Sequence, residues 1–398
     1  MSRKKDKGIS PCHFLRTANV LWGQIDLSTV DQMDFTDREL EKYALKPDDL
    51  LTCEGGEIGR TAIWQSGLGT YCYQNHLHRL RSKQEDIEPL FYMYWMQAAL
   101  LVLNLYQGTA NVTTIANLSR SRLSQFALPK PPLPEQRRIA HVLSTIQQAI
   151  AAQDDLIAAA REVKRSLMQR LFTYGPGAEP APTKETEFGI VPEHWKIVPL
   201  ETCAFVQTGA AKGRKLGDSR TVNVPYLRVA NVQDGYLDLS EVKYIQIRKS
   251  EIERYSLQSG DVVLTEGGDF DKLGRGFIWR GQIPNCIHQN HIFAVRPNRE
   301  RLLPEYLAYL VQSDYGKSYF LTVAHRTTHL ACINKTKLQA FPTLVTALDE
   351  QERIASLLSV ADRKAEAEEQ RKAALQALFE TMLHQLMTGE IRVYDVEL

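Results

Sequence analysis

PLPEQRRIAHVL at residues 132–143 and ALDEQERIASLL at residues 347–358 are two copies of one sequence, 215 residues apart. Each copy opens a long segment whose apolar residues recur at alternating steps of four and three. In the first segment the repeated positions are Ile139, Leu143, Ile146, Ile150, Gln153, Ile157, Ala160, Lys164, Leu167 and Leu171. Such heptad spacing is typical of a long helix that packs along a partner helix.

The second segment has the same spacing and supplies the partner. Its positions are Ile354, Leu358, Ala361, Ala365, Glu368, Lys372, Leu375, Phe379, Met382 and Leu386, and we call both sets together the seam. Gln153 and Glu368 hold the same place in the two copies and interrupt the seam near its centre. Antiparallel packing would bring these polar positions together, so the sequence predicts two antiparallel, coiled-coil-like helices. The alternative is that the segments are independent helical packing elements.

The repeat extends through the regions ahead of both helices. The matching stretches are LRTANVLWGQIDL (15–27) with LRVANVQDGYLDL (227–239), LTCEGGEIGRTAIW (51–64) with LTEGGDFDKLGRGFIW (264–279), QNHLHRLR (74–81) with QNHIFAVR (289–296), and LSRSRLSQF (118–126) with INKTKLQAF (333–341). The chain is therefore predicted to contain two copies of one unit. Each unit is a mixed domain followed by a long helix.

Within each domain, strands and turns come first and helix follows. Strands are predicted at residues 222–232, 237–247 and 261–265 of the second copy. Buried helices are predicted at residues 88–106 and 304–321, and a Pro-bearing strand at residues 128–133. Asp349 followed by Glu352 predicts a capping box at the start of the second long helix.

The expected fold class is α+β, with two repeated mixed domains joined by two long antiparallel helices in a pseudo-twofold arrangement. The predicted boundaries are a first domain at 1–132, a first helix at 133–175, a linker at 176–187, a second domain at 188–346, a second helix at 347–390 and a tail at 391–398.

Composition is that of an ordinary globular protein. The 398 residues are 43% hydrophobic and 24% charged, with a net charge of +1, so any nucleic-acid surface must be local. Six scattered cysteines predict buried thiols in a reducing compartment, and no apolar run reaches the roughly 18 residues of a membrane span. We expect a cytoplasmic protein.

Motifs of nucleotide-driven or methyl-transferring enzymes are missing from the sequence. It has no GxxxxGK phosphate loop and no [DN]PP[YF] motif. Asp261, Glu266 and Lys272 lack convincing nuclease spacing, and structural carboxylates explain them better. The QNH repeats with Cys72 or Cys286 nearby do not form a zinc set, and buried strand residues account for them.

The combination of PKPPLPEQRRIAHVLS with DEQERIASLLS, each opening a long helix after an IGR- or LGR-bearing domain, resembles the specificity subunit of type I restriction-modification systems. VPEHWKIVPLET at residues 191–202 resembles the usual opening of that family's target-recognition domains. The resemblance covers essentially the whole chain.

The resemblance implies a non-catalytic DNA-binding subunit whose two target-recognition domains each read half of a bipartite, asymmetric site. The helix pair would measure the distance between the halves and bind two methyltransferase subunits. Restriction subunits would join through the complex. S-adenosylmethionine, ATP and Mg would be bound by partner subunits, and no cofactor or metal by this chain.

Candidate DNA-binding residues are cations for phosphates and short polar side chains for base edges. They are Lys212, Arg214 and Lys215 in a glycine-containing loop, Arg326, Thr327 and Thr328 in HRTTH, Thr109, Asn111 and Thr113 in the aligned stretch of the first copy, and Arg120, Arg122, Lys335 and Lys337 in the short amphipathic turns. A solvated surface is the alternative for each group. The repeated EGG and G–R elements are expected to shape a hairpin.

The first copy departs from the family pattern. The second copy has about thirty residues between Trp195 and Tyr226, including the basic loop, whereas the first reaches its matching strand at Phe14 almost at once. We expect either a start placed too late or a domain without its leading strand and basic loop. The rival functions are a self-contained restriction or modification enzyme with a divergent centre, and a coiled-coil scaffold that binds protein alone.

Overall fold

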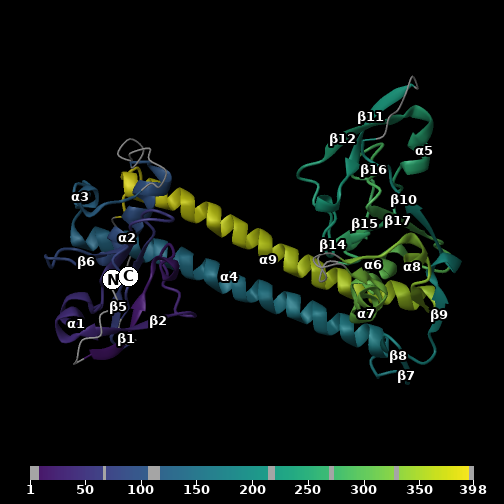
Figure 1. Ribbon diagram of the computed structural model, residues 1–398, viewed down its shortest axis with the longest axis horizontal. Coiled ribbons are helices and arrows are strands. Elements are labelled where there is room, and N and C mark those ends of the chain that lie inside the picture. The colour runs from purple at the N-terminus through teal and green to yellow at the C-terminus, as the bar shows by residue number, and fades with distance from the viewer. Residues whose placement is uncertain are drawn as a thin grey trace. The chain divides into compact units, whose positions relative to one another are not determined.

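The computed structural model describes residues 9–65, 69–105, 117–213, 220–268, 273–326 and 331–393 (Figure 1). The chain divides into two compact units. Unit 1 comprises Met1–Asp155 and Glu369–Leu398, and unit 2 comprises Leu156–Glu368. Both predicted long helices are present, as α4 (Leu133–Tyr174) and α9 (Leu348–Thr388), and each contributes residues to both units.

Among its described residues, unit 1 contains two three-stranded sheets. In the first, β1 (Ile9–Leu15) lies between the antiparallel β2 (Asp31–Thr36) and the parallel β5 (Tyr71–Tyr73). In the second, β3 (Leu50–Cys53) lies between β4 (Thr61–Ile63) and β6 (Leu77–Leu80), both antiparallel. The other elements are η1 (Thr17–Asn19), α1 (Asp37–Tyr43), α2 (Pro89–Gln97), the π-helical turn η2 (Ala98–Val102) and α3 (Arg120–Leu123).

Unit 2 repeats both sheets, adds one strand to the second of them, and has three further small sheets among its described residues. The order β12–β11–β16 corresponds to β2–β1–β5, and β10–β17–β13–β15 corresponds to β6–β3–β4 with β10 as a further outer strand. The strands are β7 (Thr183–Thr186), β8 (Gly189–Pro192), β9 (Lys196–Pro199), β10 (Ala204–Thr208), β11 (Thr221–Leu227), β12 (Lys243–Arg248), β13 (Val262–Thr265), β14 (Gly267–Gly268), β15 (Gly276–Ile278), β16 (Ile287–His288), β17 (Ile292–Pro297), β18 (His325–Arg326), β19 (Ala331–Cys332) and β20 (Pro342–Val345). The helices are η3 (Leu200–Thr202), η4 (Val229–Asn231), η5 (Lys249–Glu251), α5 (Ile252–Tyr255), α6 (Pro304–Gln312), α7 (Asp314–Val323) and α8 (Lys335–Gln339).

The two long helices pair in opposite directions within each unit. In unit 1, Ile139 near the start of α4 belongs to the same buried cluster as Leu386 near the end of α9. In unit 2, Leu171 near the end of α4 shares a cluster with Ile354 near the start of α9. Every seam position is buried or half-buried, as the heptad spacing requires.

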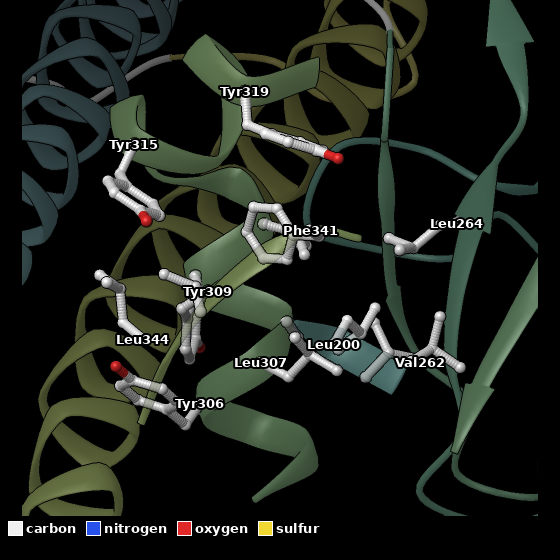
Figure 2. Packing of buried hydrophobic residues seen from close by; sticks show 14 of the residues in the cluster. Leu200, Val262, Leu264, Tyr306, Leu307, Tyr309, Tyr315, Tyr319, Phe341 and Leu344 are labelled. Carbon is white, nitrogen blue, oxygen red and sulfur yellow. The ribbon is translucent and has the colours of Figure 1, made fainter. Parts of the chain in front are cut away.

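The core of unit 2 contains a group of aromatic residues. Tyr306 and Tyr309 of α6 and Tyr315 and Tyr319 of α7 gather around Phe341 (Figure 2). Three of these tyrosines also have hydroxyl partners, because a buried hydroxyl without one is costly. The Tyr315 hydroxyl donates to the Pro342 carbonyl at 2.9 Å. The Tyr319 hydroxyl donates to the Lys337 carbonyl at 2.6 Å, and the Tyr309 hydroxyl donates to the Asp362 carboxylate at 2.6 Å.

The glutamine of the repeated EQ dipeptide, Gln136 in the first copy and Gln351 in the second, connects each long helix to its own domain. Gln351 is fully buried, and its Oε1 accepts from the Leu303 N–H at 2.9 Å just ahead of α6. Its Nε2 donates to the carbonyls of Arg301 at 2.9 Å and Thr346 at 2.8 Å. The side chain therefore joins the start of α9 to the start of α6.

Gln136 makes the equivalent bonds in unit 1. Its Oε1 accepts from the Glu88 N–H at 2.9 Å, and its Nε2 donates to the carbonyls of Asp86 at 3.1 Å and Pro131 at 2.8 Å. The residue after each of these N–H groups is the proline that begins α2 or α6. One glutamine thus satisfies three backbone groups that no helix or sheet ladder satisfies.

The preceding glutamates hold different partners in the two units. Glu135 forms a bidentate ion pair with Arg392, which follows α9. Glu350 accepts from Trp195 Nε1 at 3.1 Å and contacts His194 Nε2 at 3.1 Å. In both units, therefore, the glutamate at the start of one long helix binds a residue in the segment that follows the other long helix.

Repeated asparagines and aspartates fix the loops of the two domains. The Asn19 and Asn231 side chains each accept from an arginine N–H and donate to two loop carbonyls, at 2.8–3.0 Å in every case. Asp261 is fully buried and forms a bidentate pair with Arg296, with both bonds at 2.8 Å. Asp49 forms the same pair with Arg81. Asp261 is thus a structural carboxylate, as the sequence indicated.

Several sequence predictions about local structure are wrong. The helix predicted at residues 304–321 is two helices, because the Ser313 hydroxyl caps a new one by accepting from the Gly316 N–H at 3.2 Å. Residues 237–242 form no strand. Asp349 lies inside the first turn of α9 rather than ahead of it, so the predicted capping box does not form.

The strand predicted at residues 128–133 is also absent. In unit 2 the equivalent strand β20 pairs with β9, and unit 1 has no counterpart of β9 among its described residues. A segment without a partner strand cannot form a ladder. The cysteine prediction holds in part: none of the six, all of them within the described ranges, forms a disulfide, and Cys332 is exposed while the other five are buried.

Candidate nucleic-acid interface

Separate repeated motifs meet at one place in unit 2, around the QNH segment that links β16 to β17. Ala210, in the loop after β10, donates its N–H to the His288 carbonyl at 2.8 Å and accepts from the Asn290 N–H at 3.0 Å. Glu266 donates its N–H to the His291 carbonyl at 3.0 Å. Backbone bonds therefore join the basic loop and the EGG motif to opposite ends of QNH.

The same network continues to the HRTTH segment and the amphipathic turn. The Glu266 carbonyl accepts from the Ile333 N–H at 2.8 Å, two residues before α8. β14 pairs with β19, which pairs in turn with β18. Gly267 is required in β14, because a Cβ there would lie 2.9 Å from the Ala331 carbonyl oxygen. Five motifs distant in sequence thus form one continuous surface.

The side chains on this surface are polar and accessible. His291 is 58% exposed, and its Nδ1 lies 2.8 Å from the Glu266 carboxylate, which is 30% exposed. Lys212 is exposed in the loop that begins at Gly209. The prediction that the QNH residues are buried in a strand is wrong, because all three lie between β16 and β17, Gln289 and Asn290 are half-buried and His291 is exposed. The QNH and EGG motifs recur together at corresponding positions of both copies, and this repetition was the signal in the sequence for the His291–Glu266 pair.

Unit 1 carries the equivalent pair. His76 is 64% exposed, and its Nδ1 lies 3.5 Å from the Glu54 carboxylate. The Glu54 N–H donates to the His76 carbonyl at 3.0 Å, and its own carbonyl accepts from Leu118 at 2.8 Å. The part of the backbone frame that joins the EGG motif to QNH and to the amphipathic turn is therefore the same in both units.

His288, the residue before QNH, is buried and faces the interior. Burial lowers its pKa from 6.5 to about 4, and the nearby Asp261 carboxylate opposes this shift. The imidazole is therefore neutral near pH 7. It belongs to the support of the surface, whereas His291 belongs to the surface itself.

The candidate cations of the amphipathic turns have different surroundings. Lys337 donates its ammonium to the Val323 carbonyl, so this side chain supports the domain. The Lys335 ammonium lies 5.9 Å from the ring centre of Phe205, which is 60% exposed. Arg120 is exposed and Arg122 is half-buried. Lys335, which holds the same place as Arg120, is half-buried, so Arg120 is the exposed one of these four cations.

Seven of the predicted contact residues lie outside the described residues. They are Thr109, Asn111, Thr113, Arg214, Lys215, Thr327 and Thr328. Arg326 is described through its backbone, which pairs with Ala331 in the β18–β19 ladder. Arg326 and Ala331, the described residues on either side of Thr327 and Thr328, are therefore paired with each other at this surface.

The repeated G–R elements shape the turn between two strands, as predicted. The Arg60 and Arg275 carbonyls accept from the Cys53 and Thr265 N–H groups at 2.9 Å. The Arg60 guanidinium donates inward to the Thr17 carbonyl at 3.1 Å.

Across the described part of the chain, no three His, Cys, Asp or Glu side chains are grouped to hold a metal, and no helix is long and apolar enough to cross a membrane.

One protein-family model matches the chain, in two segments. This is the type I restriction modification DNA specificity domain, at residues 31–160 and 192–377. Each segment covers most of one domain together with part of the long helix that follows it. The two matched segments thus follow the internal repeat.

Curated relatives and solved structures agree with this match. The type I restriction enzyme MjaVIII specificity subunit of Methanocaldococcus jannaschii is 25% identical over 88% of this chain and 80% of its own length. The EcoKI specificity subunit of Escherichia coli K12 is 23% identical over 72% of this chain and 63% of its own. A chain in a structure of a type I R-M system has a TM-score of 0.60 at 17% identity, covering 96% of this chain and 93% of that one. The S subunit from M. genitalium has a TM-score of 0.50 at 15% identity, covering 96% and 91%.

Proposed function

Since the chain belongs to the type I restriction modification DNA specificity family, we propose that it is the sequence-specific DNA-binding specificity subunit of a type I restriction-modification complex. One observation carries the proposal: the two family segments coincide with the two repeated domains. Each domain would read one half of a bipartite, asymmetric site. The paired helices would set the spacing of the halves.

The surface around QNH is the proposed reading surface of unit 2. Lys212 with Arg214 and Lys215 would approach phosphates, whose contacts position a protein on the duplex. The segment of Arg326, Thr327 and Thr328 would enter the major groove, where each base pair presents a distinct pattern. The exposed His291–Glu266 pair lies between these two groups along the backbone network and extends the sequence-based set.

The chain itself would be non-catalytic. Asp261 is bound by Arg296, and Glu266 is bound by His291, so the carboxylates of the suspected nuclease string have structural partners. The proposed partners are double-stranded DNA, two methyltransferase subunits and, through the complex, the restriction subunits. S-adenosylmethionine, ATP and Mg would bind to those subunits.

The decisive experiment has two stages. Single-molecule methylome sequencing of the source strain, before and after deletion of this gene, should show one bipartite methylated motif that disappears with the gene. The purified chain should then transfer no methyl group from S-adenosylmethionine to DNA with that motif until a methyltransferase subunit is added. Methyl transfer by the chain alone, or loss of no motif, would contradict the proposal.

The reading surface is tested by a mobility shift with the same DNA. The triple change Lys212→Ala, Arg214→Ala and Lys215→Ala should weaken binding and reduce the slope of log K against log salt by up to about 3, since each phosphate contact contributes about 0.9. The triple change Lys196→Ala, Lys249→Ala and Arg299→Ala, at exposed positions of unit 2, removes the same charge and is the matched control. Equal losses in both variants would show that net charge, and not this loop, accounts for the effect.

A further inference from the structure

The QNH motif forms a tight turn in unit 2. The Gln289 carbonyl accepts from the Ile292 N–H at 2.9 Å, and a carbonyl bonded to the N–H three residues later closes a β-turn. Asn290 and His291 are the two central residues of this turn. The Gln289 N–H also donates to the Leu227 carbonyl at the end of β11, at 3.0 Å. Backbone bonds therefore hold the turn, and the Asn290 side chain with it, in a fixed place on the candidate interface.

Unit 1 has the same turn. The Gln74 carbonyl accepts from the Leu77 N–H at 3.1 Å, and the Gln74 N–H donates to the last carbonyl of β1 at 3.0 Å. Asn75 and His76 are the central residues. Asn75 is exposed and Asn290 is half-buried, so both asparagine side chains are accessible at equivalent positions of the two units.

The backbone of the turn does not require asparagine. Asparagine is favoured where φ is positive, but neither Asn75 nor Asn290 has a positive φ. The other repeated asparagines, Asn19 and Asn231, are buried, and loop backbone groups use both the oxygen and the nitrogen of their amides. A role in binding therefore explains the asparagine of QNH better than a role in folding.

A carboxylate and an imidazole orient the Asn290 side chain. The Glu266 carboxylate lies 2.8 Å from His291 Nδ1, and the other ring nitrogen, Nε2, lies 3.4 Å from Asn290 Nδ2. When the imidazole donates its Nδ1 proton to the carboxylate, Nε2 is the acceptor for an N–H of the Asn290 amide. The second N–H and the Oδ1 of the amide remain for another partner. They form one donor beside one acceptor.

We propose that Asn290 reads an adenine in the major groove of one half-site and that Asn75 reads an adenine in the other, an assignment that rests on the proposed function. Adenine presents the acceptor N7 beside the donor N6 amino group, and an asparagine amide can pair with both. Guanine presents two acceptors, N7 and O6, so the amide oxygen would have no donor there. His291 and Glu266 are positioning residues for Asn290.

The test measures binding of the chain, together with its methyltransferase subunit, to duplexes that carry the methylated motif. Each adenine of the motif is replaced in turn by 7-deazaadenine, which lacks the major-groove acceptor N7. Matched control duplexes carry 3-deazaadenine, which lacks the minor-groove acceptor N3. At one adenine in each half-site, 7-deazaadenine should lower the affinity about tenfold or more, and 3-deazaadenine should change it little.

Variants of the chain assign each sensitive adenine to one asparagine. Asn290→Ala should abolish the effect of 7-deazaadenine in one half-site and leave it in the other, and Asn75→Ala should do the reverse. Asn290→Asp keeps the shape of the side chain but has no N–H for N7, so it should act as Asn290→Ala does. Asn223→Ala, at an exposed position of β11, is the matched control and should keep both effects.

Glu266 tests the positioning role. Glu266→Ala should weaken the effect of 7-deazaadenine at the adenine assigned to Asn290. Glu266→Gln keeps an acceptor for the imidazole Nδ1–H and should restore the effect.

Three outcomes would overturn the assignment. One is coupling of the adenine to Gln289→Ala in place of Asn290→Ala, and another is an equal effect of Asn290→Ala and Asn75→Ala on both half-sites. The third is sequence-specific binding without any adenine sensitive to 7-deazaadenine, which would leave the proposed function intact. Absence of sequence-specific binding by the unchanged chain would overturn the proposed function and this assignment together.

Discussion

Replacing the buried glutamine at the start of either long helix should destabilise one unit and spare the other. Gln351 makes three hydrogen bonds of 2.8–2.9 Å to backbone groups of unit 2, and Gln136 makes three of 2.8–3.1 Å in unit 1. Methionine has a similar shape and cannot make these bonds. Gln351→Met therefore leaves one N–H and two carbonyl groups unpaired in a site from which water is excluded.

The expected magnitude follows from the number of bonds. Each intramolecular hydrogen bond contributes about 1 kcal/mol net, and an unpaired buried group costs about 1 to 3 kcal/mol. The loss of three bonds should thus lower the free energy of unfolding by about 3 kcal/mol, which is a change of roughly a hundredfold in the equilibrium constant. Gln136→Met should have a similar effect on unit 1.

Native-state hydrogen exchange read by mass spectrometry separates the two units, since peptides of α2 report on unit 1 and peptides of α6 on unit 2. Gln351→Met should accelerate exchange in α6, and Gln136→Met in α2. Gln148→Met in unit 1 and Gln169→Met in unit 2, both at exposed positions of α4, are the controls. A loss below 1 kcal/mol, or equal losses in the controls, would refute the view that these glutamines join helix to domain.

Three further perturbations follow from the structure. His288 has a pKa of about 4 in the folded protein and 6.5 in the unfolded chain, so the unfolded state binds more protons between these pH values. The free energy of unfolding should therefore fall by about 3 kcal/mol as the pH drops from 6.5 to 4. His288→Phe should flatten this part of the pH profile, measured by urea unfolding. Gly59→Ala should lower the Tm of unit 1 more than Gly56→Ala does. Both residues have φ of +78°, but a Cβ at residue 59 would lie 2.1 Å from Leu100 Cδ1, whereas a Cβ at residue 56 would have no atom within 4 Å. Equal shifts in Tm would count against this explanation. Insertion of one heptad into each long helix adds about 10.5 Å, so the spacer of the recognised DNA site should lengthen by about 3 base pairs while its halves stay the same, and an unchanged spacer in the methylome would disprove the measuring role of the helices.

The elements that local sequence determines were predictable. The long helices follow from heptad spacing over about forty residues, and the observed bounds of α4 and α9 show the same repeat. The short turns at α3 and α8 and the strand at β13 also follow from their own residues. Where a pattern is long and its partner is a copy of itself, one sequence suffices.

Features that depend on distant partners were not predictable. Residues 128–133 have the composition of a strand, yet they form none, because the described residues of unit 1 contain no strand that pairs with them. His291 looked like a buried strand residue, and its exposure depends on Glu266 and on the loop that carries Ala210. The sequence identified the motifs of the candidate interface, whereas their meeting at one surface is a property of the backbone network.

The ion pair between Glu135 and Arg392 bears on the order in which the two units fold during translation. Unit 2 is one continuous stretch, so its core is complete once residue 368 has left the ribosome. Unit 1 begins earlier but needs Phe379, Leu386, Arg392 and Val393 for its core and its helix start. The domain that is translated first is thus the last to fold, and a premature stop in the final thirty codons would damage the beginning of the protein rather than its middle.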